Sequence, residues 1–323
     1  MAHELTIREN GMAEMAFTGS RSAIWHGLGQ ELSEDSPIDV WKVEAGMNWQ
    51  VRQAPMMFMN ADNEPTAVEA RKILYRSDNA FQLGIVGEDY KIVQPGQVLE
   101  FFDDLTRLHG MKLSTAGTLF GGKHFWALAK TGQKIDVLPG DEVDAYVLLT
   151  TSADGTAATQ ARFTSTRVVC NNTLNIALAE KAKKMVKVTH HREWDATQVK
   201  IDLGLLGKSW ADFTANMERL TKIAMDEKAT RAFYQKIFFN PDKLAEDQAL
   251  AERRIVDKLM EKAFGGIGSE MSAGTAWGAL NGATELFTHW NSKRDPSQQF
   301  MDSYTGKHSN AKDKVLAGLL AMA

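Results

Sequence analysis

The sequence has very little cysteine: Cys170 is the one such residue among 323. A single cysteine excludes an internal disulfide, and disulfide frameworks are typical of secreted proteins. The N-terminal stretch also lacks the charged start and apolar core of a secretion signal. We therefore expect the protein to work in a reducing cytoplasm.

Long apolar runs are absent as well. The most apolar stretch near the end, AGLLAMA, is far shorter than the roughly 20 residues that a membrane-spanning helix requires. Hydrophobic residues still make up 44% of the chain, with 15 Phe and 8 Trp, enough to build the core of one large or two modest domains. We expect a soluble globular protein that makes no membrane contact.

No catalytic motif survives inspection. Residues 117–123 match the first seven positions of the phosphate-binding pattern G-x-x-x-x-G-K. The eighth position is His124, which lacks the hydroxyl that would hold magnesium, and the residues after it alternate like a strand. This segment is therefore predicted to be a glycine hairpin turn.

Other reactive side chains lack the neighbouring residues that a catalytic or metal site requires. Cys170 follows two valines, so we interpret it as a small buried residue. The pair His190 and His191 has no i, i+4 partner and no acidic or thiol neighbour, which disfavours a metal site. The remaining acidic pairs are attributed to solvated faces: Asp103 with Asp104, and Asp141 with Asp144. We expect neither an enzyme nor a cofactor or metal.

Hydrophobic periodicity predicts an α+β fold. The first half contains turn signals between short alternating segments, which indicates a curved, mostly antiparallel sheet of hairpins with packed helices. The predicted strands are 51–60 and 67–76, joined by a turn at 62–65, then short pieces in 81–93, a hairpin over 111–130 turned at Gly121–Gly122, and a hairpin over 145–165 turned at Asp154–Gly155.

Helical spacing predicts the remaining elements. In the first half we expect a helix that starts at Ser36–Pro37 and stops at Gly46, and another over 94–110. After Leu174 we expect a helix over 172–184, a strand within 185–191, and a helical part to the end of the chain. The division is a sheet domain over 1–194 and a helical domain over 195–323, the latter with helices over 195–264 (broken at 239–243), 274–290 and 310–323.

Charge is distributed unevenly. Residues 161–192 carry seven basic residues and one acid, so this segment has a charge of +6 while the rest of the chain carries −10. The overall charge of −4 argues against a generally polyanion-binding surface, but a local patch is compatible with it. Such a run is either a solvated helix face or a binding surface.

The segment RFTSTRVVCNNTL joins this patch to the predicted corner between strand and helix. Asn171 and Asn172 are good helix caps, so the helix is expected to start there. Arg162 and Arg167 are an odd number of residues apart and face one ligand only if the strand bends or bulges between them. Aromatic residues of the 111–130 hairpin would add stacking platforms. The predicted nucleic-acid-binding residues are Arg162, Arg167, Lys181, Lys183, Lys184, Lys187, Lys123, Phe125 and Trp126.

Three blocks of the sequence resemble a known family. VLLTTSADGTAATQARFTSTRVVCNNTLNIAL, the early WHGLGQEL and the late GTAWGALNGATE are similar to the phage/plasmid-like proteins grouped as domain of unknown function nine-three-two. The resemblance implies a place on mobile elements such as phages, prophages and plasmids, inside a bacterial host, so the expected location is the cytoplasm of that host. It implies no catalytic residues. A weaker similarity, at the level of fold alone, is to ring-forming single-strand annealing proteins of phage recombination, which need no cofactor.

Two hypotheses follow from the sequence. The first is a non-enzymatic protein of a phage or plasmid that binds single-stranded DNA, as in annealing during recombination, and forms a homo-oligomer. The second is an interaction protein that modulates a host or phage protein without binding nucleic acid, in which case the lysines only solubilise the chain.

Overall fold

A computed structural model describes residues 6–8, 10–19, 28–167, 172–175, 185–203, 209–238, 246–289, 302–303 and 306–322. The fold is α+β, as predicted from the sequence. The chain divides into two compact units. Unit 1 comprises residues 1–132, 146–163 and 185–205, and unit 2 comprises residues 133–145, 164–184 and 206–323. Unit 2 thus also includes the ends of sheet strands. The division into a sheet domain over 1–194 and a helical domain over 195–323 stays a prediction.

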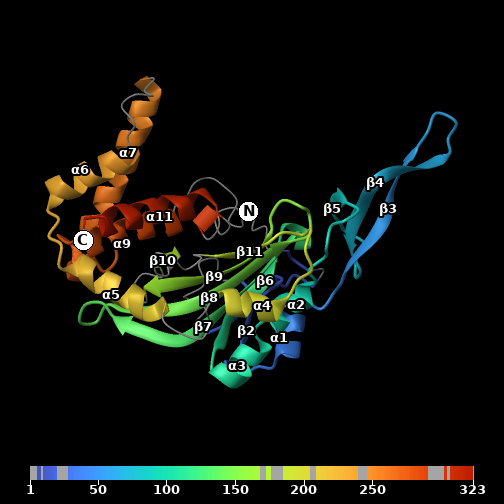
Figure 1. Cartoon of the computed structure of the whole chain (residues 1–323), viewed down its shortest axis with the longest axis horizontal. Coiled ribbons are helices and arrows are strands. Elements are labelled where there is room, and N and C mark those ends of the chain that lie inside the picture. Colours follow the sequence, from blue (N-terminus) through green and yellow to red (C-terminus); the bar gives the residue numbers. More distant parts are fainter. Residues whose placement is uncertain are drawn as a thin grey trace. The chain divides into compact units, whose positions relative to one another are not determined.

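A large, mostly antiparallel sheet forms the centre of the fold (Figure 1). Its strand order is β10-β9-β8-β7-β6-β1-β2, with β11 also paired to β9, and β1 and β2 are parallel. The strands are β1 (Met15–Thr18), β2 (Gln30–Leu32), β6 (Lys112–Leu119), β7 (His124–Asp136), β8 (Glu142–Ser152), β9 (Thr159–Arg167), β10 (Asn172–Asn175) and β11 (Val186–Val188).

Glycines lie in two turns of this sheet that the sequence predicted, at Gly121–Gly122 and at Gly155. β6 and β7 pair across a 3-10 turn, Phe120–Gly122, in which Gly121 and Gly122 have φ angles of 73° and 93°. A Cβ atom on Gly122 would lie 2.7 Å from the Trp49 ring, so a larger residue cannot occupy this turn without displacing the ring. Because β7 begins directly after the turn, the G-x-x-x-x-G-K match is a hairpin and not a phosphate loop.

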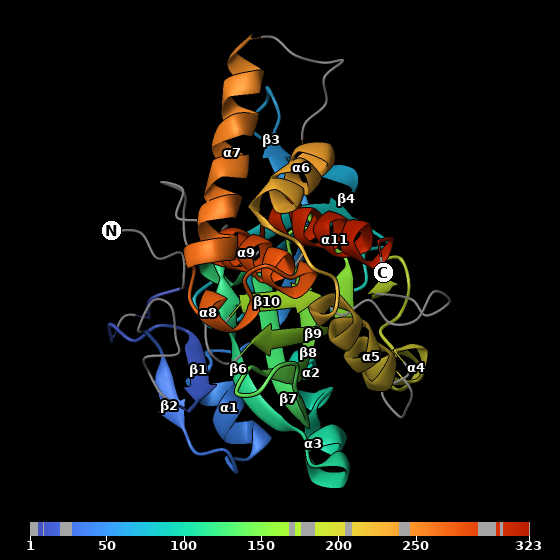
Figure 2. The ribbon, with the colours of Figure 1, turned by 90° about the vertical axis from the view of Figure 1, so that its left-hand side faces the viewer.

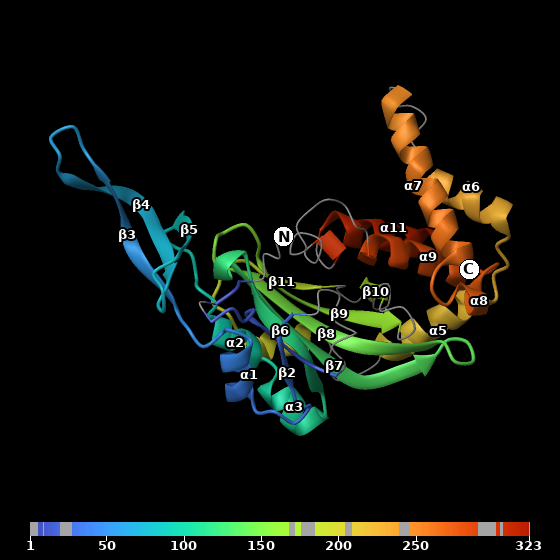
Figure 3. The ribbon, with the colours of Figure 1, turned by 180° about the vertical axis from the view of Figure 1, so that it is seen from behind.

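A second, three-stranded antiparallel sheet has the order β3-β4-β5. It consists of β3 (Val51–Met59), β4 (Pro65–Arg76) and β5 (Gln82–Gly87), which confirms the strands predicted over 51–60, 67–76 and 81–93. β3 and β4 extend well beyond β5 as a two-stranded ribbon (Figures 1 and 3).

Short helices complete unit 1: α1 (Ile38–Glu44), α2 (Pro95–Glu100), α3 (Asp103–His109) and α4 (Ala196–Asp202). Helix α1 begins close to the predicted start at Ser36–Pro37, with Pro37 at its N-cap and no side-chain hydrogen bond to cap it. The predicted single helix over 94–110 is two helices, α2 and α3. Phe101 and Phe102 lie at the break and are 1% and 0% exposed, so the chain bends where it buries both rings.

Unit 2 is built around one buried helix. Residues 276–287 of α9 (Ala276–His289) are all buried, and α9 packs against α7, α11 and β10 (Figure 2). A Cβ atom on Gly282 would lie 2.6 Å from the backbone nitrogen of Ala263, so glycine lets α7 approach closely. The other helices are α5 (Ser209–Thr221), α6 (Glu227–Phe238), α7 (Glu246–Gly265), α8 (Ser269–Ser272) and α11 (Lys307–Leu320).

The start of the predicted helix over 172–184 is wrong. Residues 172–175 form β10, which pairs antiparallel with β9 and places Asn172 opposite Arg167. Asn172 therefore lies in a strand and does not cap a helix, while Cys170, Asn171 and residues 176–184 lie outside the described residues. The expected strand after them is confirmed as β11.

Two acidic residues that the sequence assigned to a solvated face are buried: Asp141 is 0% and Asp144 4% exposed. Asp141 Oδ2 accepts a hydrogen bond of 2.8 Å from Nε1 of Trp277 in α9. Within the described ranges, no helix is both long and apolar enough to cross a membrane.

Candidate functional site

Of the predicted basic patch, Arg162 and Lys187 lie on neighbouring strands. β11 pairs with β9 so that Lys187 is opposite Gln160, and Lys187 is exposed. Arg162 is buried, and its Nη2 atom donates hydrogen bonds to Oε1 of Gln160 and to Sδ of Met185. Arg162 therefore joins β9 to the residue before β11. Because it is buried, it does not contribute to the surface patch that was predicted.

Phe125 and Trp126 are core residues, 1% and 3% exposed. The Phe125 ring meets the Trp49 ring edge-on at 5.6 Å, and Trp126 Nε1 donates to Oγ1 of Thr115 at 3.2 Å. A nucleic-acid base cannot stack on either ring without opening this core, so neither ring is available as a stacking platform.

The other predicted residues give no assembled patch within the described part of the chain. Lys123 is half-buried in the β6–β7 turn, where its carbonyl accepts a hydrogen bond from the Ala153 backbone. Arg167 has a described backbone, in β9, and no described side chain. Lys181, Lys183 and Lys184 lie outside the described residues.

The ribbon of β3 and β4, which we call the arm, carries a run of exposed apolar side chains. Met57, Phe58 and Met59 are 48%, 51% and 60% exposed although they lie in a strand. Phe58 pairs with Thr66, while its neighbours pair with Ala67 and Pro65 on the alternate face. Apolar side chains are therefore uncovered on both faces, which a soluble protein rarely leaves without a partner.

The far end of the arm is nevertheless a built turn. Oδ1 of Asn60 accepts hydrogen bonds from the backbone nitrogens of Asp62 and Glu64, at 3.0 and 2.9 Å. Asn63, with a φ of 65°, completes the turn in a conformation that asparagine tolerates. We call residues 55–70 the arm tip.

An irregular stretch lies where the tip of the arm meets the root. Pro55 pairs with Lys72 and Met57 with Ala67, so residues 68–71 of β4 oppose Met56 alone. Ala70 has a φ of 57°, which is unusual for a residue with a Cβ atom.

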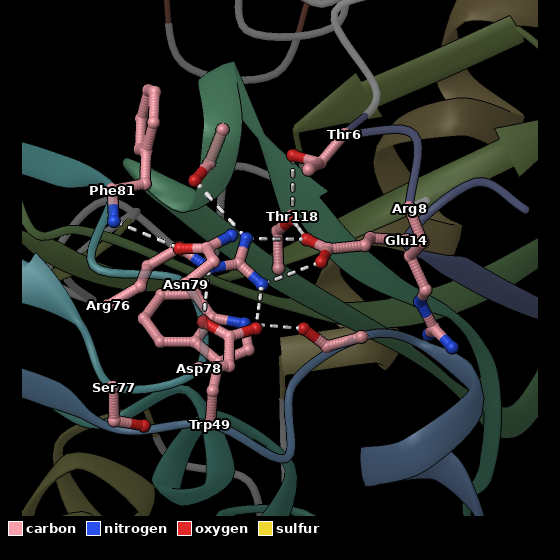
Figure 4. A network of polar contacts seen from close by, with 12 residues as sticks. Thr6, Arg8, Glu14, Trp49, Arg76, Ser77, Asp78, Asn79, Phe81 and Thr118 are labelled. Carbon is pink, nitrogen blue, oxygen red and sulfur yellow. Dashed lines mark hydrogen bonds and ion pairs between the residues drawn. The ribbon is translucent and has the colours of Figure 1, made fainter. Parts of the chain in front are cut away.

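Arg76 fixes the root of the arm to the main sheet within unit 1 (Figure 4). Its Nη2 atom lies 2.7 Å from Oε1 of Glu14 and 2.7 Å from Oδ2 of Asp78, and its guanidinium stacks at 4.1 Å over the Trp49 ring. Burial disfavours the charged form of Arg76, but the hydrogen bonds and charges of Asp78 and Glu14 outweigh burial and raise its pKa above the usual range.

The β6–β7 hairpin completes this network. Thr118 Oγ1 donates to Oε2 of Glu14, and the carbonyl of Gly121 accepts a 3.2 Å hydrogen bond from Nη1 of Arg76. Burial opposes ionisation of Asp78, yet the Arg76 guanidinium holds the pKa of Asp78 below its usual value. The arm is therefore anchored by a charged cluster, and this cluster is structural.

A model of the family described as domain of unknown function (DUF932) matches residues 82–306, which is 225 of the 323 residues. The chain belongs to this family. The DUF932 segment begins at the first residue of β5, so the arm precedes it. No curated protein and no solved structure matches the chain.

Within the DUF932 segment, the side chains of His124, Asp154 and Thr156 contact one another. Nε2 of His124 lies 3.0 Å from Oγ1 of Thr156 and 3.3 Å from Oδ2 of Asp154. A catalytic triad needs the acid and the nucleophile on opposite ring nitrogens, and here both meet the same one. Burial raises the pKa of Asp154, but hydrogen bonds from His124 and Thr156 outweigh it and hold that pKa below its usual range. The cluster secures the β8–β9 turn.

A second DUF932 cluster is built on His190, which is buried. Its ring stacks on Tyr90 at 4.3 Å, and its Nδ1 and Nε2 atoms lie 2.8 and 3.1 Å from the carbonyls of Lys91 and Ala157. Burial lowers the pKa of His190, and the two carbonyls partly offset that effect. The Tyr90 hydroxyl donates to the Ser152 carbonyl at 2.8 Å, and burial raises the pKa of Tyr90 well above its usual value.

In both the His124 and the His190 clusters, the polar atoms form contacts that join loops of unit 1. In the described ranges, no group of three or more His, Cys, Asp or Glu residues could hold a metal ion. The sequence reasoning missed the arm and its anchor. The apolar run PMMFM was a usable signal for the arm, because five such residues without alternation do not suit a strand covered on one face.

Proposed function

We propose that the protein is a non-enzymatic interaction protein and that the arm is its contact surface for another protein molecule. The observation that carries this proposal is the exposure of Met57, Phe58 and Met59 on both faces of a well-formed ribbon. A two-stranded ribbon is marginally stable in water by itself, so contact with a partner would stabilise it.

The charge of the arm tip favours a protein over nucleic acid as its partner. Residues 55–70 contain three acids, Asp62, Glu64 and Glu69, and no lysine or arginine. Ribbons that enter a DNA groove depend on cations that neutralise phosphates. A surface that is both apolar and acidic lacks this contribution.

Photo-crosslinking tests this function. We expect a benzophenone amino acid at position 58 to give a protein adduct of defined mass, in purified protein or in bacterial extract, because the partner covers that side chain. The same probe at Leu108, which is 72% exposed on α3, is the matched control and should give none. Absence of an adduct at position 58 in both samples would refute the proposal.

Single-strand nucleic-acid binding is the second candidate. It is supported by the charge of +6 on residues 161–192 against −10 elsewhere, and by the exposed position of Lys187 in β11. With Arg162, Phe125 and Trp126 buried, contacts to phosphate would fall to Arg167, Lys187, Lys123 and the lysines at 181, 183 and 184. In this case the role in recombination, the phage or plasmid origin and the bacterial cytoplasm remain parts of the proposal.

A salt titration with labelled single-stranded oligonucleotide tests this second candidate. Binding predicts that the triple variant of Lys183, Lys184 and Lys187 to Ala loses about three units of log-log salt slope, one per phosphate contact. The control is a triple variant with the same charge change on exposed lysines of unit 2: Lys222, Lys228 and Lys236 to Ala. Equal binding by both variants would rule out this patch.

A further inference from the structure

Charge is segregated along the arm. The tip carries Asp62, Glu64 and Glu69, all exposed, whereas Arg52 and Arg71 lie at the root and are also exposed. None of these five side chains forms an ion pair with any described residue. The arm therefore has an acidic end and a basic end, and no side chain in the described part of the chain forms an ion pair with either group.

The basic end is also an apolar platform. Arg52 pairs with Tyr75, and Ile73 pairs with Ile85 of β5, so these side chains share one face of the three-stranded sheet with Arg71. Ile85 is 44% exposed, and Tyr75 and Ile73 are half-buried. We call Arg52, Arg71, Ile73, Tyr75 and Ile85 the root face.

The tip and the root face complement each other in charge and in apolar surface. The tip offers acids around Met57, Phe58 and Met59, and the root face offers arginines around an apolar centre. One arm cannot fold its tip onto its own root, because the tip and the root are successive parts of the same two strands. A second arm laid antiparallel brings each tip to the other's root.

We propose that two copies of the chain associate through antiparallel arms, with the arm tip of each copy on the root face of the other. This inference rests on the proposed function and names the partner as a second copy. A two-fold arrangement uses the same complementarity twice, which doubles the effect of each side chain on the association. Like charges would meet if the arms lay parallel, so the antiparallel direction follows from the charge pattern.

Sedimentation equilibrium of the purified full chain tests the association. We expect a concentration-dependent species of twice the chain mass of 35.8 kDa. Phe58→Ser should weaken the dimer roughly a hundredfold, because two apolar contacts are lost per dimer. Leu108→Ser removes an exposed apolar side chain of the same unit and should leave the dimer unchanged. A chain that is monomeric at every concentration overturns the inference.

Charge exchange tests the antiparallel contact. A root variant (R52E and R71E) and a tip variant (D62K, E64K and E69K) should each dimerise about tenfold more weakly than the native chain at low salt. Mixing the two variants should restore the dimer, because opposite charges then meet at both contacts: the acidic tip of the root variant lies on the basic root of the tip variant, and the basic tip of the tip variant lies on the acidic root of the root variant. These substitutions are at exposed positions, and circular dichroism checks that each variant is folded. Native dimerisation by both single variants, or no recovery on mixing, overturns the tip-to-root contact.

The two proposals fail in different ways. An adduct at position 58 that forms in bacterial extract and not in the purified protein, together with a monomeric mass, leaves the interaction function standing and overturns self-association. Absence of the adduct from both samples overturns the function and the inference together.

Discussion

Replacing Arg76 with methionine is expected to lower the free energy of unfolding by about 3–5 kcal/mol. The side chain is 2% exposed and bonds Glu14, which is 3% exposed, through two nitrogens. Methionine fills much of the same volume and provides no charge, so Glu14 would remain in the core without its cation. Urea denaturation followed by tryptophan fluorescence measures the loss, since Trp49 lies against the guanidinium.

A surface ion pair provides the matched control. Lys42 lies 3.0 Å from Glu100 and 3.3 Å from Asp39, both of which are exposed. Lys42→Met should cost less than about 1 kcal/mol, because water screens this pair. Adding Glu14→Gln to Arg76→Met should recover part of the loss, since the uncompensated charge is then removed. If Arg76→Met costs no more than Lys42→Met, the cluster does not anchor the arm.

The sequence predicted those parts of the fold that local backbone chemistry decides. Gly121–Gly122 and Asp154–Gly155 mark the two hairpin turns because positive φ angles are allowed at glycine, whatever the rest of the chain does. The α+β class followed from these turns and from the change of period after the sheet. The Asn171–Asn172 signal failed because capping is a local preference, and pairing of residues 172–175 with β9 outweighed it.

The candidate site could not be predicted to the same extent, because exposure depends on distant parts of the chain. The sequence predicted that Phe125 and Trp126 lie in a strand whose rings are free to stack on a base. All of residues 125–129 are buried, so β7 is covered on both faces here. Glu14 and Arg76 are 62 residues apart and share no periodic pattern. The strands of the arm were predicted, and the run PMMFM was a local signal of an unusual strand, but whether its apolar residues remain uncovered depends on distant parts of the chain.

Replacing Trp277 with alanine is expected to destabilise unit 2 by about 3–5 kcal/mol. The ring is 3% exposed on the buried helix α9, and its nitrogen donates to Asp141, which is fully buried. Alanine would leave a cavity and remove this donor from a carboxylate that has no access to water. Circular dichroism of helix content during urea denaturation measures the loss, since most helices belong to unit 2.

Trp277→Phe separates the two contributions. Phenylalanine retains most of the ring volume and lacks the nitrogen donor, so its cost of about 1–3 kcal/mol reports the hydrogen bond to Asp141. The control is Trp194→Phe, at a half-buried position in unit 1, which should cost less than about 1 kcal/mol. Native stability of Trp277→Phe would mean that Asp141 gains nothing from the indole. A cost equal to that of Trp277→Ala would instead assign the whole effect to this one hydrogen bond. The stability of α9 would then depend on Asp141, an acidic residue that the sequence placed at the surface.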